Sequence, residues 1–257
     1  MKNYKILTLL VLFLVGLGVA SAAPAINITP DQVNLNGSFT GSVSQYFTVN
    51  NTGTENLSVR VVKYSLTNGA YSIDYTMDTT SFSLANGSSP KSIKLTIGQL
   101  SSSNYPTGVY TGNICVVGNI SVFSVTDCST ISLTVNQNPV ISVDSFSISG
   151  EQNSSFSKTF KVTNTGNTPL NNVIINPITY MDKYNITYDL SNFDLSFGES
   201  KEITLNGFIP YADSGITKGT LKVTSDLTNA SSNITLTVTS KLKITEVVLT
   251  CNVEKDE

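Results

Sequence analysis

Histidine and tryptophan are both absent from this 257-residue sequence, and only three cysteines are present. The lack of histidine excludes Ser-His-Asp and Cys-His nucleophile systems, histidine acid–base catalysis and histidine-based zinc sites. Cys115, Cys128 and Cys251 do not have the spacing of zinc ligands. The sequence also contains no phosphate-binding loop and no dinucleotide-binding fingerprint. These absences exclude the commonest catalytic and cofactor sites, and we expect no cofactor.

Charged residues are scarce as well, at 13% of the chain, and the net charge is −3 at pH 7. A mildly acidic chain without clusters of Lys and Arg argues against nucleic acid and anionic lipid as partners. Disordered chains usually have more charge and fewer aromatic and β-branched residues than this one, which contains 11 Tyr and 11 Phe. We therefore expect folded domains, about two for a chain of this length.

Long apolar runs are missing except at the N-terminus. Lys2 and Lys5 precede an almost unbroken apolar stretch over residues 6–20, and Ala20-Ser21-Ala22 matches a small-x-small cleavage pattern. The stretch is short of the roughly 20 residues that a membrane-spanning helix needs. We therefore predict a signal peptide at 1–22, an exported protein at the cell surface or outside the cell, and no membrane span after cleavage. The alternative is an uncleaved N-terminal anchor.

One stretch occurs twice, as Tyr46–Gly53 (YFTVNNTG) and again as Thr159–Gly166 (TFKVTNTG). In each copy apolar residues alternate with polar ones, as in a half-buried strand, and Asn-Thr-Gly follows with the chemistry of a turn. The copies are separated by about the length of one immunoglobulin-like sandwich, roughly 100 residues. This spacing indicates an internal duplication.

Short alternating runs continue through both halves, with turn signals between them at the spacing of a β-sandwich. Residues in the second half, such as Leu221 and Val223, match residues in the first, such as Ile114 and Val116. We therefore predict an all-β fold after the signal peptide. It consists of two tandem immunoglobulin-like β-sandwiches, at residues 24–137 and 138–240. The short connector at Asn136–Pro139 lacks a flexible Gly/Ser tract, which favours an extended rod.

Two motifs resemble a known family. The Phe-x-Val-x-Asn-Thr-Gly turn occurs at Phe47–Gly53 and Phe160–Gly166, and a Gly-x-Tyr-x-Gly-x-Ile-x-Val strand occurs at Gly108–Val116. Together they are similar to the immunoglobulin-like repeats of archaeal and bacterial exported surface proteins, the CARDB-type modules in particular. The resemblance implies an extracellular spacer, adhesion or assembly role, with no catalytic residues. The second copy departs from the strand motif at Thr217, where the tyrosine is missing.

Cys115 and Cys128 lie on the last two predicted strands of the first sandwich. Ile114 and Val116 should point into the core, as should Ile131, so alternation turns both thiols outward. If Cys115 faces Cys128, both lie on one face of one hairpin, where an exported protein can oxidise them. We predict a Cys115–Cys128 disulfide, with a pair of free thiols as the alternative. By the same register Lys222 and Ser231 take these two places in the second copy.

Carboxylates are the acid–base groups that remain available. A pair of them could hydrolyse a glycosidic bond, and loop acids could bind calcium. The candidates for a pair are Asp74 with Asp78, and Asp182 with Asp189 and Asp194; those for calcium are Asp182 and Asp213. Because no spaced Asp/Asn motif or pocket signal surrounds them, we interpret them as solvated strand and loop residues. We expect neither an enzyme nor a metal site.

Two Tyr-x-Ile-x-Tyr runs contain Tyr71 with Tyr75, and Tyr184 with Tyr188. These rings could form a platform that stacks on glycans. However, alternation with the central isoleucine places the tyrosines on the core side of a strand, where a ring contributes buried area and its hydroxyl finds a partner. We therefore expect core packing, with the glycan platform as the alternative.

Asn-x-Ser/Thr sequons without proline at x are the one abundant chemical motif, and they mark acceptor sites for N-linked glycans. The asparagines are Asn27, Asn36, Asn50, Asn56, Asn86, Asn119, Asn153, Asn185, Asn229 and Asn233. Many such triplets arise by chance in a chain rich in Asn, Ser and Thr. Glycosylated sites and ordinary polar turn residues therefore both stay open, and Asn50 lies at a strand end where its side chain could be partly buried.

The tail at 241–257 has strand composition over Leu242–Thr250. We interpret it as the first strand of a truncated third module; the alternative is a C-terminal strand that pairs with the second sandwich or with a neighbouring molecule. Cys251 has no evident partner in the sequence, which fits truncation or intermolecular pairing.

The sequence as a whole predicts a non-enzymatic structural, adhesive or assembly protein of the cell surface. Its partners would be an envelope or surface protein or a glycan, with self-association through exposed edge strands as a further route. The alternative function is a carbohydrate-binding accessory module of a larger exported enzyme or envelope complex.

Overall fold

The computed structural model of the chain describes residues 23–121 and 123–241. The predicted signal peptide and nearly all of the predicted tail, including Cys251, lie outside the described residues. None of the helices in the described part of the chain is long and apolar enough to cross a membrane.

The described residues divide into two compact units. Residues 23–100 and 108–136 form unit 1, and residues 101–107 and 137–241 form unit 2. The strands of unit 1 are β1 (Ile26–Thr29), β2 (Gln32–Asn36), β3 (Val43–Asn51), β4 (Leu57–Lys63), β5 (Leu66–Asn68), β6 (Tyr71–Ile73), β7 (Thr76–Met77), β8 (Ser81–Leu84), β9 (Lys91–Ile97), β10 (Gly108–Ile120) and β11 (Phe123–Val135). The strands of unit 2 are β12 (Ile141–Val143), β13 (Phe146–Glu151), β14 (Ser154–Asn164), β15 (Leu170–Ile175), β16 (Thr187–Tyr188), β17 (Asn192–Leu195), β18 (Ser200–Ile209), β19 (Gly215–Thr224) and β20 (Asn229–Thr239). The described residues contain one other regular element, the 3-10 helix η1 (Asp182–Tyr184).

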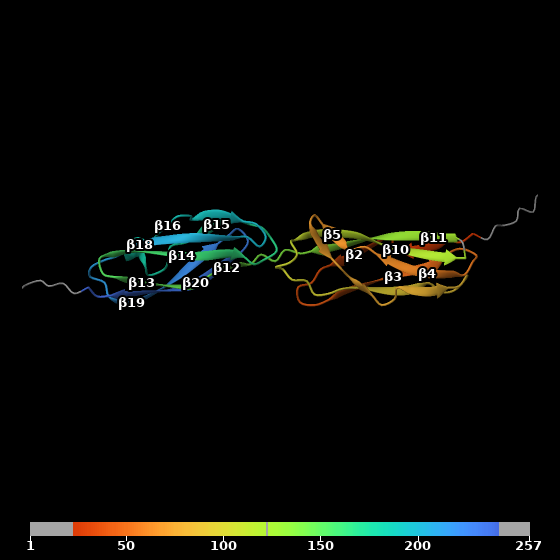
Figure 1. Cartoon of the computed structure of the whole chain (residues 1–257), viewed down its shortest axis with the longest axis horizontal. Helices are drawn as coiled ribbons and strands as arrows, with labels where there is room; N and C mark the ends of the chain where they lie inside the picture. Colours follow the sequence, from red (N-terminus) through yellow and green to blue (C-terminus); the bar gives the residue numbers. More distant parts are fainter. Residues whose placement is uncertain (1–22, 122, 242–257) are drawn as a thin grey trace, which may run out of the picture. The chain divides into compact units, whose positions relative to one another are not determined.

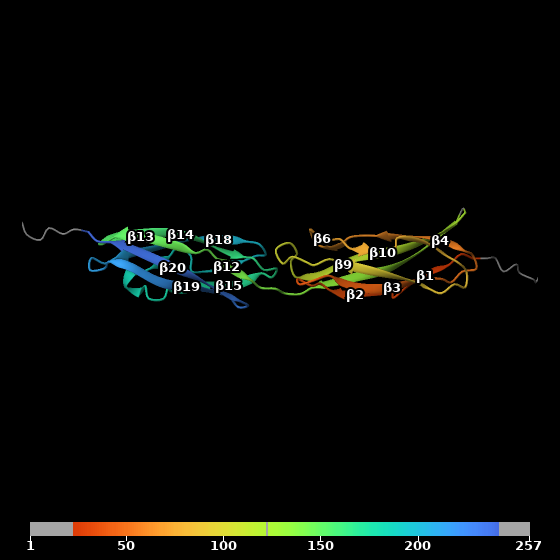
Figure 2. The same cartoon turned by 90° about the horizontal axis from the view of Figure 1, so that it is seen from below.

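The fold is nearly all-β, and the strands of each unit form two sandwich-like sheets (Figure 1 and Figure 2). In unit 1 the sheet orders are β1-β3-β9-β7 and β2-β11-β10-β4-β8, with the β5–β6 hairpin attached to β10. In unit 2 they are β12-β14-β18-β16 and β13-β20-β19-β15-β17.

Strand for strand, unit 2 repeats the order of unit 1, and β5 and β6 have no counterpart. In both units the first two strands belong to different sheets. The second of them pairs in parallel with the last strand, as β2 does with β11 and β13 with β20. The described strand pairs are otherwise antiparallel.

The alternation of apolar residues places the core between the sheets. Phe47 and Val49 of β3 are buried in unit 1, and Phe160 and Val162 of β14 are buried in unit 2. The ring of Phe160 stacks on Phe146 at a centroid distance of 5.0 Å. Each fully buried side chain of this size contributes about 1.5–3 kcal/mol relative to exposure, so the period-2 pattern is sufficient to fix which face of each strand is inside.

The repeated Asn-Thr-Gly turn links the two sheets of a unit through a buried amide. Asn51, at the end of β3, is 6% exposed. Its Nδ2 donates to the carbonyl of Glu55 (2.6 Å) and to that of Leu84 (3.1 Å), which lies on β8 in the other sheet. Its Oδ1 accepts from the N–H of Gly53 (3.0 Å). The asparagine of the motif is therefore a staple between layers.

Unit 2 uses the same staple. Asn164 Nδ2 donates to the carbonyls of Thr168 (2.8 Å), Leu195 (3.3 Å) and Ser196 (3.1 Å). Its Oδ1 accepts from the N–H of Gly166 (3.1 Å). Leu195 lies on β17, the counterpart of β8, so both copies connect the same two places in the fold.

The glycine of the motif is required by close approach of the backbone. A Cβ atom on Gly53 would clash with the backbone of Ala23 and Ala25, and one on Gly166 would clash with the backbone of Asn138 and Val140. The Asn-Thr-Gly turn thus fits against the segment that enters its own unit, which no larger residue would permit.

β10 and β11 form a long hairpin whose pairing continues to Ile120 and Phe123. One expectation about strands was wrong. The Tyr-x-Ile-x-Tyr runs are not continuous strands. β6 ends at Ile73, where the Asp74 carboxylate accepts the N–H of Tyr75 (2.9 Å). In unit 2, η1 occupies the start of the run and ends at an asparagine in the left-handed conformation.

Candidate functional site

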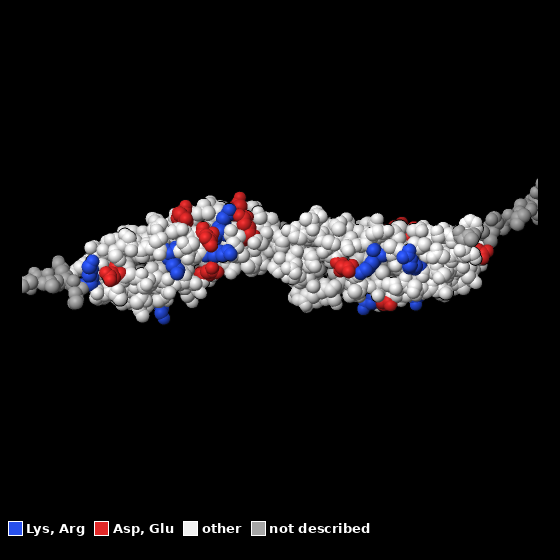
Figure 3. Space-filling model, in the orientation of Figure 1, with Lys and Arg blue, Asp and Glu red and all other residues white. Residues whose placement is uncertain are grey.

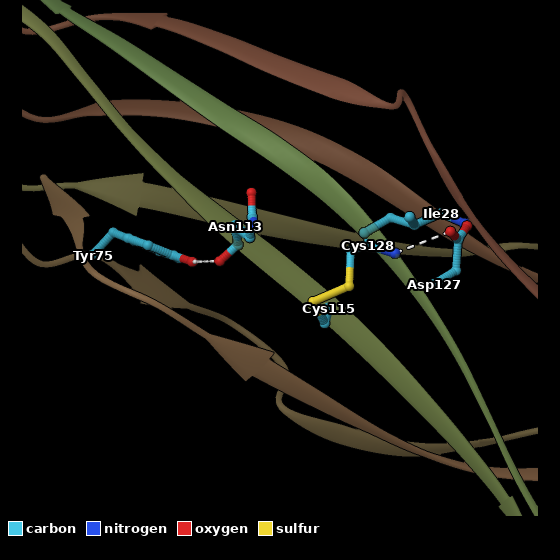
Figure 4. Close-up of a disulfide and its surroundings, with 6 residues drawn as sticks. All are labelled: Ile28, Tyr75, Asn113, Cys115, Asp127 and Cys128. Carbon is cyan, nitrogen blue, oxygen red and sulfur yellow. Dashed lines mark hydrogen bonds between the residues drawn. A yellow bond between two sulfur atoms is a disulfide. The ribbon is translucent and has the colours of Figure 1, made fainter.

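The predicted disulfide is confirmed. β10 and β11 pair with Cys115 directly opposite Cys128, and the two sulfurs are bonded (Figure 4). Cys115 is half-buried and Cys128 exposed, on the outer face of the hairpin. Next to it, the Asp127 carboxylate accepts the N–H groups of Ile28 (2.8 Å) and Cys128 (2.9 Å). The bond therefore staples the hairpin where β1 packs against it, and it is not a reactive thiol site.

In unit 2 the two cysteine positions are occupied by Lys222 and Ser231, as predicted. Lys222 of β19 lies directly opposite Ser231 of β20, the same register that Cys115 and Cys128 have in unit 1. Both residues are exposed. The disulfide is thus an addition to a hairpin that folds without it in the other unit.

Most of the Asp residues considered above for catalysis or calcium binding accept hydrogen bonds from backbone N–H groups or from a lysine. The contacts are Asp74 with Lys63 Nζ (2.8 Å), Asp78 with the Lys94 N–H (3.0 Å), Asp189 with the Thr204 N–H (2.8 Å), Asp194 with the Asn172 N–H (2.8 Å) and Asp213 with Lys183 Nζ (2.7 Å). Asp182 is exposed at the start of η1 and lines a hollow of about 310 Å³. Within residues 23–121 and 123–241, no three acidic or cysteine side chains gather as metal ligands.

The pairs with lysine contribute to the lowered pKa values of the Asp74 and Asp213 carboxyl groups. The hydrogen bond from Lys63 lowers the pKa of Asp74, and the N–H of Tyr75 lowers it further. Burial is the largest single effect on Asp213 and raises its pKa, but the hydrogen bonds from Lys183 and Tyr184 and the charge of Lys183 together outweigh it, so the pKa of that carboxyl is lowered. Both carboxyls are ionised near neutral pH, which does not suit a general acid.

The proposed tyrosine platform does not form. Tyr75 is 2% exposed and Tyr184 is fully buried, while Tyr188 is half-buried with its hydroxyl donating to the carbonyl of Asn176 (3.3 Å). The core interpretation is therefore confirmed for Tyr75 and Tyr184. It was wrong for Tyr71, which is 39% exposed and lies next to the turn of the short β5–β6 hairpin.

The sequon asparagines are exposed, apart from Asn50, which is half-buried as expected. Asn50 lies directly opposite Asn27 in the β1–β3 pair. Asn56 Oδ1 accepts the N–H of Asn86 (2.9 Å), and Asn56 and Asn119 line one open hollow. Glycosylation at these positions stays a prediction, and their exposure is compatible with it.

Charge is sparse on the surface. On the face shown in Figure 3, acidic and basic side chains form small mixed groups separated by uncharged surface. On this face no large field of one sign would steer a ligand, so a site there would be recognised by local chemistry and shape.

The most unusual surface residue is Tyr180, whose side chain is 81% exposed. It lines a hollow of about 370 Å³ together with Lys218 and Thr220 of β19, Asn233 and Thr235 of β20, and the backbone of Gly219 and Ile234. We call this the Tyr180 hollow. Thr220 lies opposite Asn233, and Lys218 opposite Thr235, so these four side chains form two cross-strand pairs at one place on the sheet.

The backbone around Tyr180 is tightly held. Thr179 donates its N–H to the carbonyl of Thr220 (3.1 Å), and its Oγ1 accepts the N–H of Thr220 (2.9 Å). Ile178 and Met181 are buried on either side. Gly219 allows this loop to cross β19, since a Cβ there would clash with the carbonyl of Thr179. The exposed ring therefore projects from a fixed segment.

Tyr180 also has a φ of 62°, in the left-handed region. That conformation is an outlier for a bulky residue and costs on the order of 1–3 kcal/mol. Sequence reasoning missed this residue because Ile-Thr-Tyr-Met has no strand alternation and lies outside the Tyr-x-Ile-x-Tyr runs. An aromatic residue in a loop without a core partner was the one signal available.

No family model matches the chain, and no curated protein matches it. Similar solved structures include a protein of unknown function from Porphyromonas gingivalis W83, 13% identical, with a TM-score of 0.37 and coverage of 82% of this chain and 99% of that chain. The E. coli chaperone DraB is 14% identical, with a TM-score of 0.33 and coverage of 82% and 97%. The endo-fucoidan hydrolase MfFcnA4 of glycoside hydrolase family 107 is 12% identical, with a TM-score of 0.31 and coverage of 86% and 29%. Likenesses this weak carry no weight for function.

Proposed function

We propose that the chain is an exported, non-enzymatic protein of the cell surface or envelope, built from two tandem immunoglobulin-like modules of the CARDB type and acting as a structural or adhesive element. The observation that carries this proposal is the use of one strand order in both compact units, each with its own core and its own Asn-Thr-Gly staple. A second copy of one sandwich adds surface for contact with a partner.

The Cys115–Cys128 disulfide supports an extracellular location, because such bonds persist in oxidising compartments and are rare in the cytosol. The predicted signal peptide points to the same compartment. The resemblance of the Phe-x-Val-x-Asn-Thr-Gly turn to surface-protein repeats supports the structural or adhesive role.

Protease treatment of intact cells of the source organism tests the proposal. Peptides from residues 23–241 should appear in the supernatant, while peptides of a cytosolic marker protein stay absent. Release of these peptides only after lysis would place the chain inside the cell and contradict a surface role.

Self-association by strand addition would use the edges of the sheets. The edge strands are two to six residues long, and the longest is β13 (Phe146–Glu151). Short edges protect a sheet from unwanted pairing, and β13, as the longest edge strand, is the least protected. We therefore propose β13 as the edge where a strand of a second copy or of an envelope protein would add. Sedimentation velocity at increasing protein concentration measures this self-association.

A second candidate function is a carbohydrate-binding accessory module of a larger exported enzyme or envelope complex. It is favoured by the Tyr180 hollow, where an exposed ring adjoins hydroxyl, amide and ammonium groups.

A further inference from the structure

The Tyr180 ring is exposed at an energetic cost that the fold does not require. Its left-handed backbone is unfavourable for a bulky residue, and an 81% exposed side chain recovers little of that cost by packing. The buried anchors Ile178 and Met181 and the paired bonds between Thr179 and Thr220 hold the segment in place. Because the backbone that carries the ring is held in place, stacking of a flat ligand needs to order only the Tyr180 side chain.

The groups around the ring match the chemistry of a sugar. Stacking uses the apolar face of a pyranose, and the Asn233 amide and the hydroxyls of Thr220 and Thr235 can donate to or accept from ring hydroxyls. The lining therefore combines one apolar platform with several convergent polar groups, as ligand sites generally do.

The charge of the residues that line the hollow indicates which class of sugar would bind. Lys218 is the charged side chain in the Tyr180 hollow, and no carboxylate lines it. Among the described residues Lys218 forms no ion pair. An ammonium without a partner, next to an aromatic ring, complements a ligand that carries a carboxylate or sulfate.

We propose that the Tyr180 hollow binds an acidic sugar residue of a surface or envelope polysaccharide, with the pyranose ring on Tyr180 and its anionic group on Lys218. This inference deepens the adhesive role proposed above and rests on it for the source of the ligand. The cell-surface experiment and the binding experiment can fail separately, because one measures location and the other measures affinity.

One sequon bears on the site. Asn233 lies in the hollow, and Thr235 completes its Asn-x-Thr triplet. A glycan on Asn233 would cover the site, so binding must be measured on full-length protein produced in a host that does not glycosylate it.

Isothermal titration calorimetry with oligogalacturonate, compared with a neutral galactose oligomer of similar length, tests the proposal. The acidic oligomer should bind, and the neutral one should bind at least about tenfold more weakly. Added salt should lower the affinity for the acidic oligomer. Tyr180→Ala and Lys218→Gln should each reduce affinity for the acidic oligomer about tenfold.

Matched variants separate this site from general effects. Tyr180→Phe keeps the ring and should keep binding, and Lys222→Gln removes an exposed lysine of the same strand outside the hollow and should leave affinity unchanged. Absence of binding to the acidic oligomer, equal binding of both oligomers, or unchanged affinity in the folded Tyr180→Ala variant would overturn the proposal. Loss of self-association in that variant, without saccharide binding to the parent protein, would also overturn it and assign the ring to a contact between copies.

Discussion

At the scale of single residues, two amides and one strained tyrosine distinguish this protein from a generic sandwich. The sequence identified Asn-Thr-Gly as a turn, but it did not show that Asn51 and Asn164 reach the opposite sheet, because that contact depends on where β8 and β17 end. The exposure of Tyr180 likewise depends on how residues 176–181 follow the edge of β19, which no local pattern encodes.

Asn164→Ala should lower the free energy of unfolding by about 3 kcal/mol, because it leaves buried carbonyl and N–H groups without their amide partner. Urea unfolding monitored by tyrosine fluorescence or circular dichroism measures the change. Asn206→Ala, at an exposed position on β18, is the matched control and should stay within about 0.5 kcal/mol of the parent. A staple variant as stable as this control would refute the role of the amide.

Tyr180→Asn should raise the free energy of unfolding by about 0.5–1 kcal/mol, because asparagine tolerates the left-handed conformation far better than tyrosine does. The same variant should lose affinity for the acidic oligosaccharide. Stability and binding are measured on one preparation by thermal unfolding and calorimetry. A loss of stability would mean that the ring packs more than its exposure indicates.

Burial raises the pKa of Tyr75 and of Tyr188 from 10.0 to about 12. Between these values the unfolded chain releases phenolic protons that the folded chain keeps, so stability is retained below pH 10 and falls as the pH rises towards 12. Urea unfolding at pH 9 and pH 11 should show this decline, and the Tyr188→Phe variant should show a smaller one. An equal decline in both proteins would exclude Tyr188 as a contributor.

At the scale of elements, strand pairing was the most predictable part of the fold. Alternation of apolar residues assigned the faces of β10 and β11 and placed both thiols on one face of the hairpin, and the structure shows Cys115 directly opposite Cys128. The prediction that the Tyr-x-Ile-x-Tyr runs are strands was wrong because the pattern alone cannot reveal a break inside an alternating segment. Asp74 ends the first run by accepting the Tyr75 N–H, and η1 replaces the start of the second.

The shared register of the two last hairpins yields an engineering prediction. Lys222→Cys combined with Ser231→Cys should form a disulfide in unit 2, since these residues pair as Cys115 and Cys128 do. By the loop-closure argument the new bond should add about 3 kcal/mol to the stability of that unit. Peptide mass spectrometry without reduction identifies the cross-link. Lys218→Cys with Ser231→Cys, which are out of register, is the control and should stay reduced; a failure of the paired variant to oxidise would contradict the equivalence of the hairpins.

At the scale of the whole molecule, duplication and composition were readable from the sequence, and the ligand was not. Low charge and absent histidine argued against the common catalytic and cofactor sites, and two copies of one turn indicated a duplication. The structural or adhesive role was implied by the resemblance of that turn to surface-protein repeats. The two units indeed share one strand order. The binding site that we propose includes a loop that differs between the units, where a repeat pattern gives no information.

We propose an exported surface protein, and peptide mass spectrometry of native protein from its own cells is the decisive experiment. Protein recovered with the envelope or the medium should begin at Ala23, after loss of 1–22, and should contain Cys115 and Cys128 in one disulfide-linked peptide pair. Recovery from the cytosol with residues 1–22 retained and both thiols reduced would contradict the account.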